Sequence, residues 1–110
     1  MINIYDPTSL KDLVGSCIKK DLIVMKQSVQ YPHLRVVKYK RKVFFDNLWD
    51  DFLVECRGLV IDADYNVVVN PMTKIFNYGE NGRYPNISHD DLIYAYRKFN
   101  GFLGCVTNHD

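Results

Sequence analysis

The sequence has 110 residues, 47% of them hydrophobic and 14% aromatic, and its 14 Lys and Arg nearly balance 13 Asp and Glu, for a formal net charge of +1. This composition is typical of a folded globular chain, and the length fits a single domain over residues 1–110, which excludes a large two-domain enzyme for this chain alone. The near-zero charge also excludes a basic or acidic tail as the feature that selects a partner.

No apolar run approaches the roughly 20 residues that a membrane-spanning helix needs, and residues 1–9 lack the basic and apolar stretches of a secretory signal. We therefore expect a cytoplasmic protein with no membrane partner. The three cysteines, Cys17, Cys56 and Cys105, are widely spaced and odd in number, which favours reduced, buried thiols over a disulfide framework. The cysteines and histidines show no metal-ligand spacing, so they predict no metal site.

The first element predicted along the chain is a helix. Asp6 can cap its first turn, and Pro7 is tolerated at the first helical position. Lys19 and Lys20 suit the negative end of the helix dipole. Apolar residues recur between these signals at the spacing of one helix face. The predicted apolar stripe consists of Leu10, Leu13, Val14, Cys17 and Ile18.

Short β-rich runs follow the helix and are separated by polar segments. The predicted strands cover residues 22–25, 34–39, 53–62, 67–76, 94–98 and 102–107. Between them, residues 44–52 predict a loop or short helical turn whose aromatic side chains pack over the core, and residues 88–91 predict a short helical turn. The predicted fold class is therefore α+β, with an N-terminal helix and a mainly antiparallel sheet.

Glu55-Cys56-Arg57-Gly58 is the first segment that could carry chemistry. Side chains two apart in a strand share a face, so Glu55 and Arg57 are expected to project together. The planar fork of the Arg57 guanidinium matches phosphate oxygens, and a neighbouring carboxylate could fix its direction. An exposed ion pair that contributes little to stability explains the same residues.

A second candidate pair lies in Pro71-Met72-Thr73-Lys74-Ile75-Phe76-Asn77. In an extended chain Lys74 and Phe76 share a face, and a cation beside an aromatic plane suits a nucleotide. The alternative is that Phe76 belongs to the hydrophobic core and Lys74 to its rim.

Lys98-Phe99-Asn100-Gly101 has two interpretations. Asn-Gly between two β-rich runs is typical of a hairpin turn. Alternatively, Lys98 is a nucleophile whose amine attacks the α-phosphate of a nucleotide and forms a phosphoramidate, while Gly101 permits close approach of the ligand to the backbone. These four residues alone leave both interpretations open.

In this order, the three segments, with Glu80-Asn81 after the second, resemble the N-terminal part of the tRNA-repair RNA ligase family of T-even bacteriophages, over about residues 34–104. The resemblance implies the covalent nucleotidyltransferase fold that DNA ligases and mRNA capping enzymes share. It also implies a reaction in three steps that uses ATP with Mg²⁺ or Mn²⁺. A lysine is adenylylated with release of pyrophosphate, AMP passes to an RNA 5′-phosphate, and a 3′-hydroxyl then attacks with loss of AMP.

The resemblance also implies a role for each matched residue. Lys98 would be the adenylylated nucleophile, and Gly101 would let the nucleotide approach. Arg57 and Lys74 would be cationic contacts near the ATP phosphates, with Phe76 beside them in the nucleotide pocket. Positive charge there would stabilise the charge that develops on the pyrophosphate leaving group.

Three further positions complete the implied site. Tyr39 stands at the place of a family tyrosine near the triphosphate. Glu55 and Asn100 are supporting residues by the same resemblance. Asn100 departs from the family pattern, because the family's nearest members carry an acidic residue at this position.

The family's later motifs supply acidic metal ligands and a lysine pair, and they follow the nucleophile, whereas this sequence extends only twelve residues beyond Lys98. We therefore expect an N-terminal portion of a ligase, inactive alone, with most metal ligands outside it. The expected partners are RNA with 5′-phosphate and 3′-hydroxyl ends, tRNA by resemblance, and a second chain that completes the domain. RNA contacts would come from a local basic cluster of Lys38, Lys40, Arg41 and Lys42, which a solvated edge explains equally.

Two functions of other classes remain open from the sequence. One is a non-catalytic ligase remnant that binds nucleotide, RNA or a partner chain. The other is a small structural domain in which the Lys98 segment is only a hairpin.

Overall fold

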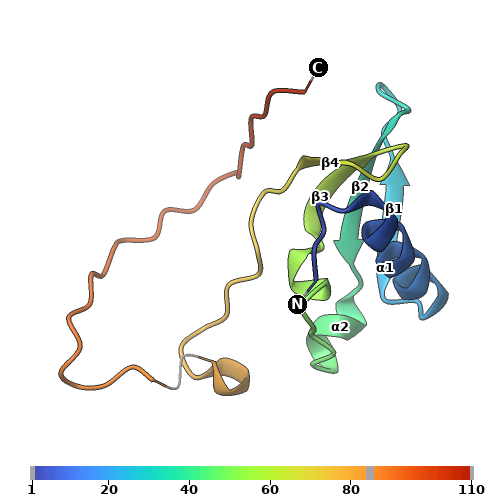
Figure 1. Cartoon of the computed structure of the whole chain (residues 1–110). Helices are drawn as coiled ribbons and strands as arrows, with labels where there is room; N and C mark the ends of the chain where they lie inside the picture. The colour runs from blue at the N-terminus through green and yellow to red at the C-terminus, as the bar shows by residue number, and fades with distance from the viewer. Residues whose placement is uncertain (1, 84–85, 110) are drawn as a thin grey trace. The chain divides into compact units, whose positions relative to one another are not determined.

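The computed structural model describes residues 2–83 and 86–109. The chain divides into two units, residues 1–74 with 105–110, and residues 75–104. The first unit has an α+β fold with an N-terminal helix and a four-stranded antiparallel sheet, which confirms the predicted fold class (Figure 1). Within the described part of the chain, no helix combines the length and the hydrophobicity needed to cross a bilayer.

Helix α1 (Pro7–Lys19) begins where the sequence predicts. The Asp6 carboxylate accepts a hydrogen bond from the backbone N–H of Thr8 at 3.3 Å and so caps the first turn. The predicted stripe is buried at Leu10, Val14 and Cys17. Ile18 is 46% exposed, because it lies at the flank of the stripe in the last turn.

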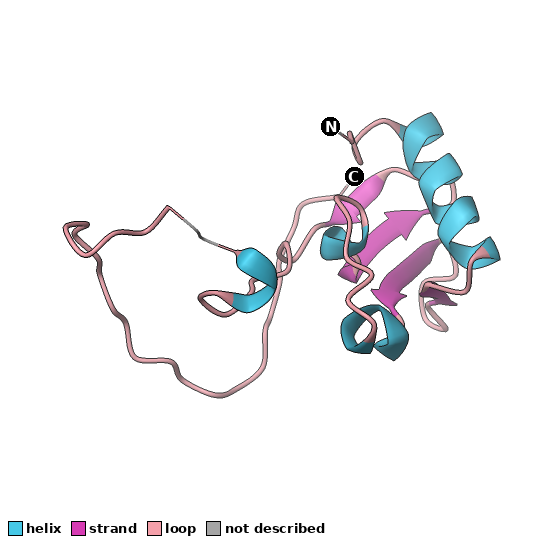
Figure 2. Cartoon of the chain, turned by 90° about the horizontal axis from the view of Figure 1, so that it is seen from below, coloured by secondary structure: helices cyan, strands magenta, loops and turns pink. Residues whose placement is uncertain are grey.

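The sheet consists of four strands that pair in chain order. Figure 2 shows the strands in magenta. They are β1 (Ile23–Gln27), β2 (Leu34–Tyr39), β3 (Arg57–Asp62) and β4 (Val67–Val69). One face of the sheet packs with α1 around a single hydrophobic core, to which the strands contribute Ile23, Val37, Leu59 and Ile61. The opposite face carries the alternate residues, which are exposed or half-buried valines and exposed cations, among them Val24, Lys26, Val36, Lys38 and Val60.

A β-bulge interrupts the pairing of β2 with β3. Val37 pairs with Leu59, whereas Lys38 pairs with Arg57, so Gly58 is the extra residue. The φ of Gly58 is +87°, a left-handed conformation that glycine adopts without strain. The bulge therefore places Arg57 opposite Lys38, on the face of the sheet away from the core side chain of Leu59.

Two predicted strands are shorter in the structure. Residues 53–55 form the 3₁₀ turn η1 (Leu53–Glu55), because the Asp50 carboxylate accepts hydrogen bonds from the N–H groups of Phe52 and Leu53 at 3.0 and 2.7 Å. β3 therefore begins at Arg57. β4 ends at Val69, and Pro71, which has no N–H to donate to a ladder, follows it.

The aromatic segment between β2 and β3 is only partly the predicted cover of the core. The helical turn forms earlier than expected, as α2 (Arg41–Phe45). Phe52 is buried and Trp49 is half-buried, but Phe45 is 73% exposed. Phe45 ends α2, and its ring packs edge-on against that of its neighbour Phe44.

The cysteines are all free, and two of them confirm the predicted burial. Cys17 and Cys56 lie in the hydrophobic core. The prediction is wrong for Cys105, which is exposed because the chain around it forms no helix or strand that could cover it.

The second unit has one short helical element among its described residues, the 3₁₀ turn η2 (Glu80–Gly82). The helical turn predicted at residues 88–91 is a hydrogen-bonded turn, in which the Ser88 N–H donates to Asp91 Oδ2 at 2.8 Å and the Asp91 N–H to the Ser88 carbonyl at 3.2 Å. The strands predicted at residues 94–98 and 102–107 do not form in the described chain. A strand requires a neighbour for its backbone groups, and these residues are not among the strands that pair in the sheet.

Candidate functional site

Lys74 is held above two aromatic rings of the first unit. Its ammonium lies 5.5 Å from the centroid of the Trp49 ring and 5.6 Å from that of Phe44, distances at which cation–π attraction acts. Its backbone N–H donates a hydrogen bond to the carbonyl of Val54 at 2.7 Å. Both the backbone and the charged end of Lys74 therefore have defined contacts.

Tyr39 joins the same group of side chains through Trp49. The two ring centroids are 4.8 Å apart with an interplanar angle of 73°, an edge-to-face contact. The Tyr39 backbone N–H donates to the carbonyl of Cys56 at 2.9 Å, which fixes its position beside β3. Tyr39 and Lys74, two site residues predicted from the sequence, thus belong to one group of side chains. We call this group, Tyr39, Phe44, Trp49 and Lys74, the aromatic cluster.

The Glu55 carboxylate holds the segment that carries Lys74. It accepts hydrogen bonds from the Thr73 hydroxyl at 2.7 Å and from the Asn70 side-chain amide at 3.2 Å. The predicted shared strand face of Glu55 and Arg57 is wrong, because Glu55 lies in η1 and not in β3. No ion pair joins these two side chains in the described chain.

Arg57 is exposed at the start of β3, on the strand that pairs with β2. Its Cα partner is Lys38, and Tyr39 is the next residue of β2. The bulge at Gly58 therefore places the Arg57 position one residue away from a member of the aromatic cluster.

Phe76 belongs to the second unit and is 5% exposed. The guanidinium of Arg83 lies 4.1 Å from the centroid of its ring, a close cation–π contact. The next backbone N–H, of Asn77, donates to Glu80 Oε1 at 2.8 Å and ties this stretch to η2. The burial of Phe76 agrees with the alternative in which it is a packing residue.

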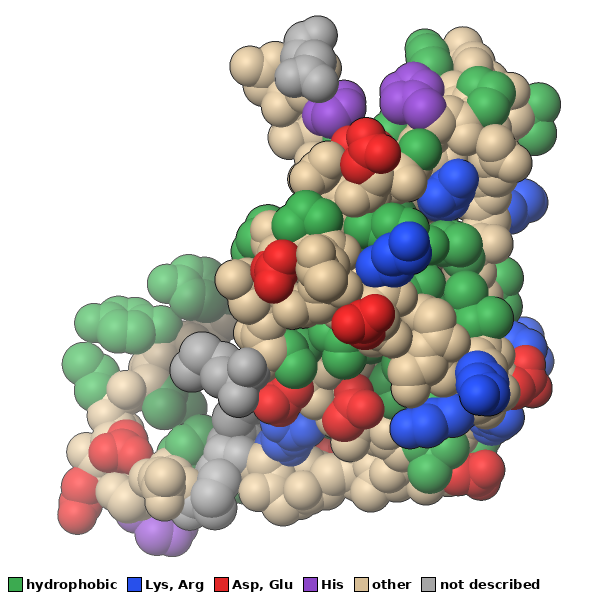
Figure 3. Space-filling view, turned by 45° about the vertical axis from the view of Figure 1, so that its right-hand side comes forward, with side chains coloured by type: hydrophobic (Ala, Val, Ile, Leu, Met, Phe, Trp, Pro, Cys, Tyr) green, Lys and Arg blue, Asp and Glu red, His purple; other side chains and the backbone are tan. Residues whose placement is uncertain are grey.

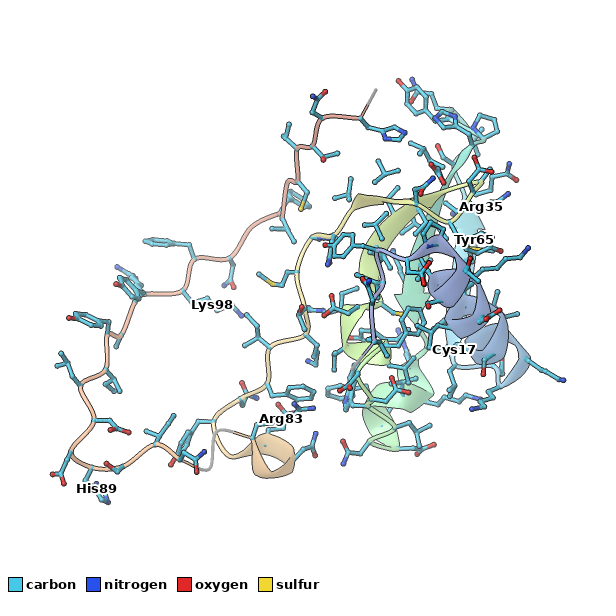
Figure 4. The ribbon with its side chains drawn as sticks, viewed as in Figure 1. Cys17, Arg35, Tyr65, Arg83, His89 and Lys98 are labelled. Carbon is cyan, nitrogen blue, oxygen red and sulfur yellow. The ribbon has the colours of Figure 1, made fainter. Side chains whose placement is uncertain are left out.

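Lys98, Asn100 and Gly101 are exposed on an extended stretch of the second unit (Figure 4). The side chains on either side of Lys98 contact one another, with the Arg97 guanidinium 5.7 Å from the centroid of the Phe99 ring. The hairpin alternative for Asn100-Gly101 does not hold here, since neither flanking segment forms a strand.

The sequence analysis missed two members of the aromatic cluster, Phe44 and Trp49. In the part of the chain that the structure describes, no group of three or more His, Cys, Asp or Glu side chains could hold a metal ion. No family model, curated protein or solved structure matches the chain.

Proposed function

We propose that this chain is part of an ATP-dependent RNA ligase of the covalent nucleotidyltransferase type, which joins RNA 5′-phosphate and 3′-hydroxyl ends, as in tRNA repair. The observation that carries the proposal is the aromatic cluster. Tyr39 and Lys74 are the residues that the resemblance assigns near the ATP phosphates, and both contact Trp49 although they are distant in the sequence. A shared location is what a common ligand requires of them.

In the proposed reaction, the Lys98 amine attacks the α-phosphorus of ATP. A nitrogen–phosphorus bond forms, the bond from that phosphorus to the bridging oxygen breaks, and pyrophosphate leaves with the electron pair while the amine proton passes to solvent. Arg57 and Lys74 contribute positive charge against the developing charge of the leaving group. Attack by an RNA 5′-phosphate then transfers AMP, and attack by a 3′-hydroxyl on the activated end releases AMP and joins the strands.

Aromatic contacts explain how Lys74 can serve this reaction. A lysine ammonium on a flexible chain loses conformational freedom when it binds a phosphate. The contacts with Trp49 and Phe44, together with the hydrogen bond of the neighbouring Thr73 hydroxyl to Glu55, restrict Lys74 before any ligand binds. Mg²⁺ or Mn²⁺ would supply further charge neutralisation at the phosphates, from ligands outside the described residues.

The test is an intact-mass measurement after prolonged incubation with ATP and Mg²⁺. This portion alone is not expected to join RNA ends, but we expect a slow mass increase of one AMP per chain in the parent protein and none in Lys98→Ala. Lys19→Ala, at an exposed lysine in the last turn of α1, is the matched control and keeps the adduct. If no adduct forms but ATP raises the melting temperature, the chain binds nucleotide without catalysis. If neither occurs, the proposal is wrong.

A further inference from the structure

Two cations lie directly opposite each other on the face of the sheet that α1 leaves open. Lys38 on β2 and Arg57 on β3 are Cα partners in the antiparallel ladder, and both are exposed. Side chains of such partners start only about 5 Å apart, and like charges in this arrangement destabilise the pair. In the described chain neither cation forms an ion pair with a carboxylate.

The bulge creates this arrangement. If β3 paired regularly with no bulge at Gly58, the alternation of side chains would turn Arg57 to the same face as Leu59, which is buried in the core. The two-for-one pairing at Gly58 reverses that alternation and brings Arg57 to the face of Lys38. A conformation that only glycine adopts freely is thus combined with a pairing that costs stability.

The same face contains a hollow of about 360 Å³ beside Lys38. It is lined by Val24, Lys26, Val36, Lys38 and Tyr39, so its rim carries a second lysine and its walls are partly apolar. The acidic residue of β3 on this face, Asp62, is already engaged, because its carboxylate accepts hydrogen bonds from the backbone N–H groups of Asp64 and Asn66 at 2.9 Å. The hollow therefore presents positive charge to a ligand.

We propose that Lys38 and Arg57 clamp a polyphosphate, either the triphosphate tail of a nucleotide or free pyrophosphate. The inference rests on the proposed function and deepens it, since the resemblance assigns Arg57 but no role to Lys38. The guanidinium fork can donate two hydrogen bonds to two oxygens of one phosphate, while the ammonium acts as a point charge beside the next. A ligand with adjacent phosphates relieves the repulsion between the two cations, whereas a monophosphate engages them less completely.

The experiment measures pyrophosphate, ATP and AMP binding by isothermal titration calorimetry to the parent chain, Lys38→Gln and the control Lys19→Gln. We expect Lys38→Gln to bind pyrophosphate and ATP at least about tenfold more weakly than the parent chain, because one charge-assisted contact is lost. Lys19→Gln should bind both ligands with the affinity of the parent chain. AMP should bind weakly to all three proteins. Equal pyrophosphate affinity of Lys38→Gln and the parent chain would overturn the clamp.

A thermal measurement separates the clamp from a structural role of Lys38. Without ligand, Lys38→Gln should melt at the parent temperature or higher, because the substitution removes the repulsion with Arg57. Pyrophosphate should raise the melting temperature of the parent chain more than that of Lys38→Gln. A lower melting temperature of the unliganded variant with an unchanged pyrophosphate effect would contradict the proposal.

The two proposals can fail separately. Lys98→Ala should bind pyrophosphate like the parent chain, since Lys98 is not part of the clamp. If pyrophosphate binding depends on Lys38 but ATP yields no adduct, the clamp stands and the ligase proposal fails; the reverse pattern retires the clamp alone. If a single-stranded RNA without terminal phosphates binds through Lys38 and pyrophosphate does not, the face is an RNA contact and the clamp is wrong.

Discussion

Burial raises the thiol pKa of two of the three cysteines. Cys17 and Cys56 lie in the core, and the Cys56 thiol donates to the Phe52 carbonyl at 3.4 Å. Burial is the main cause that raises the pKa of Cys56 and of Cys17, and the nearby carboxylate of Asp50 adds to it. Both thiols therefore stay protonated in the folded chain at pH values where an exposed thiol ionises.

The raised pKa values predict that the folded state loses stability in alkali. Below the ordinary thiol pKa of about 8.5, both states hold the protons and the contribution is fully present. Above it, the unfolded chain ionises first, so the free energy of unfolding falls as pH rises. Urea unfolding at pH 7 and pH 9.5 measures the difference, which should shrink in Cys56→Ala and persist in Cys105→Ser, a change at an exposed thiol. The same loss of unfolding free energy between the two pH values in all three proteins would contradict this prediction.

Single residues also show where the sequence could not predict the site. Nothing in its spacing connects Trp49 with Lys74, because their contact depends on how η1 and the segment after β4 fold. The role of Glu55 was likewise misread, since strand parity does not apply to a 3₁₀ turn. The resemblance identified Tyr39 and Lys74 by motif, and only the structure brings them to a common ring.

Elements defined by local signals were predicted well. The cap at Asp6 and the period of the apolar stripe gave α1, and the β-rich run 34–39 matches the bounds of β2. The start of β3 was missed because the Asp50 carboxylate caps η1 over residues that read as a β-rich run. The predicted strands at 94–98 and 102–107 failed for another reason, since alternation describes a strand's side chains but not its partner.

Two Gly→Ala substitutions, one at the bulge and one inside α1, should have opposite effects on stability. Alanine at Gly58 meets only Pro71, at 4.0 Å, so the cost is the left-handed φ of +87°, about 1–2 kcal/mol. At Gly15, inside α1, a new Cβ meets nothing within 4 Å, and alanine should stabilise the helix by roughly 0.5–1 kcal/mol. Urea midpoints should therefore fall for Gly58→Ala and rise for Gly15→Ala. A stable Gly58→Ala chain would mean that β3 can pair without the bulge.

The charge of the whole molecule is too small to attract a polyanion, so any such attraction must come from a local group of cations. Basic and acidic side chains lie interspersed on the face that Figure 3 shows, in keeping with the net charge of +1. In the basic cluster proposed for RNA, Lys40 and Lys42 both pair with Asp21. Part of the positive charge expected for RNA is therefore already compensated, which leaves the Lys38 and Arg57 pair as the stronger candidate for phosphate.

The two units differ in how many of their residues are buried and hydrogen-bonded. The first has a buried core and a hydrogen-bonded sheet, whereas every described residue from 86 to 104 is exposed, including Tyr96 at 87% and Phe99 at 80%. Few buried contacts and exposed backbone groups mark a segment that opens at low free-energy cost. Large apolar side chains without cover also favour contact with another apolar surface.

This difference predicts the order of cleavage by trypsin. Brief digestion of the native chain should cut after Arg97 and Lys98 before it cuts after Lys11 in α1 or Lys38 in β2, because the latter sites require part of the core to unfold. Mass spectrometry of a time course gives the order, and digestion in urea, where all four sites are open, is the control for intrinsic preference. Simultaneous cleavage at all four sites in the native chain would show that the helix and sheet unit is no more stable than the extended segment. Early cleavage after Arg97 would leave a fragment that retains Lys38, Arg57 and Lys74 but lacks Lys98, on which pyrophosphate binding can be measured.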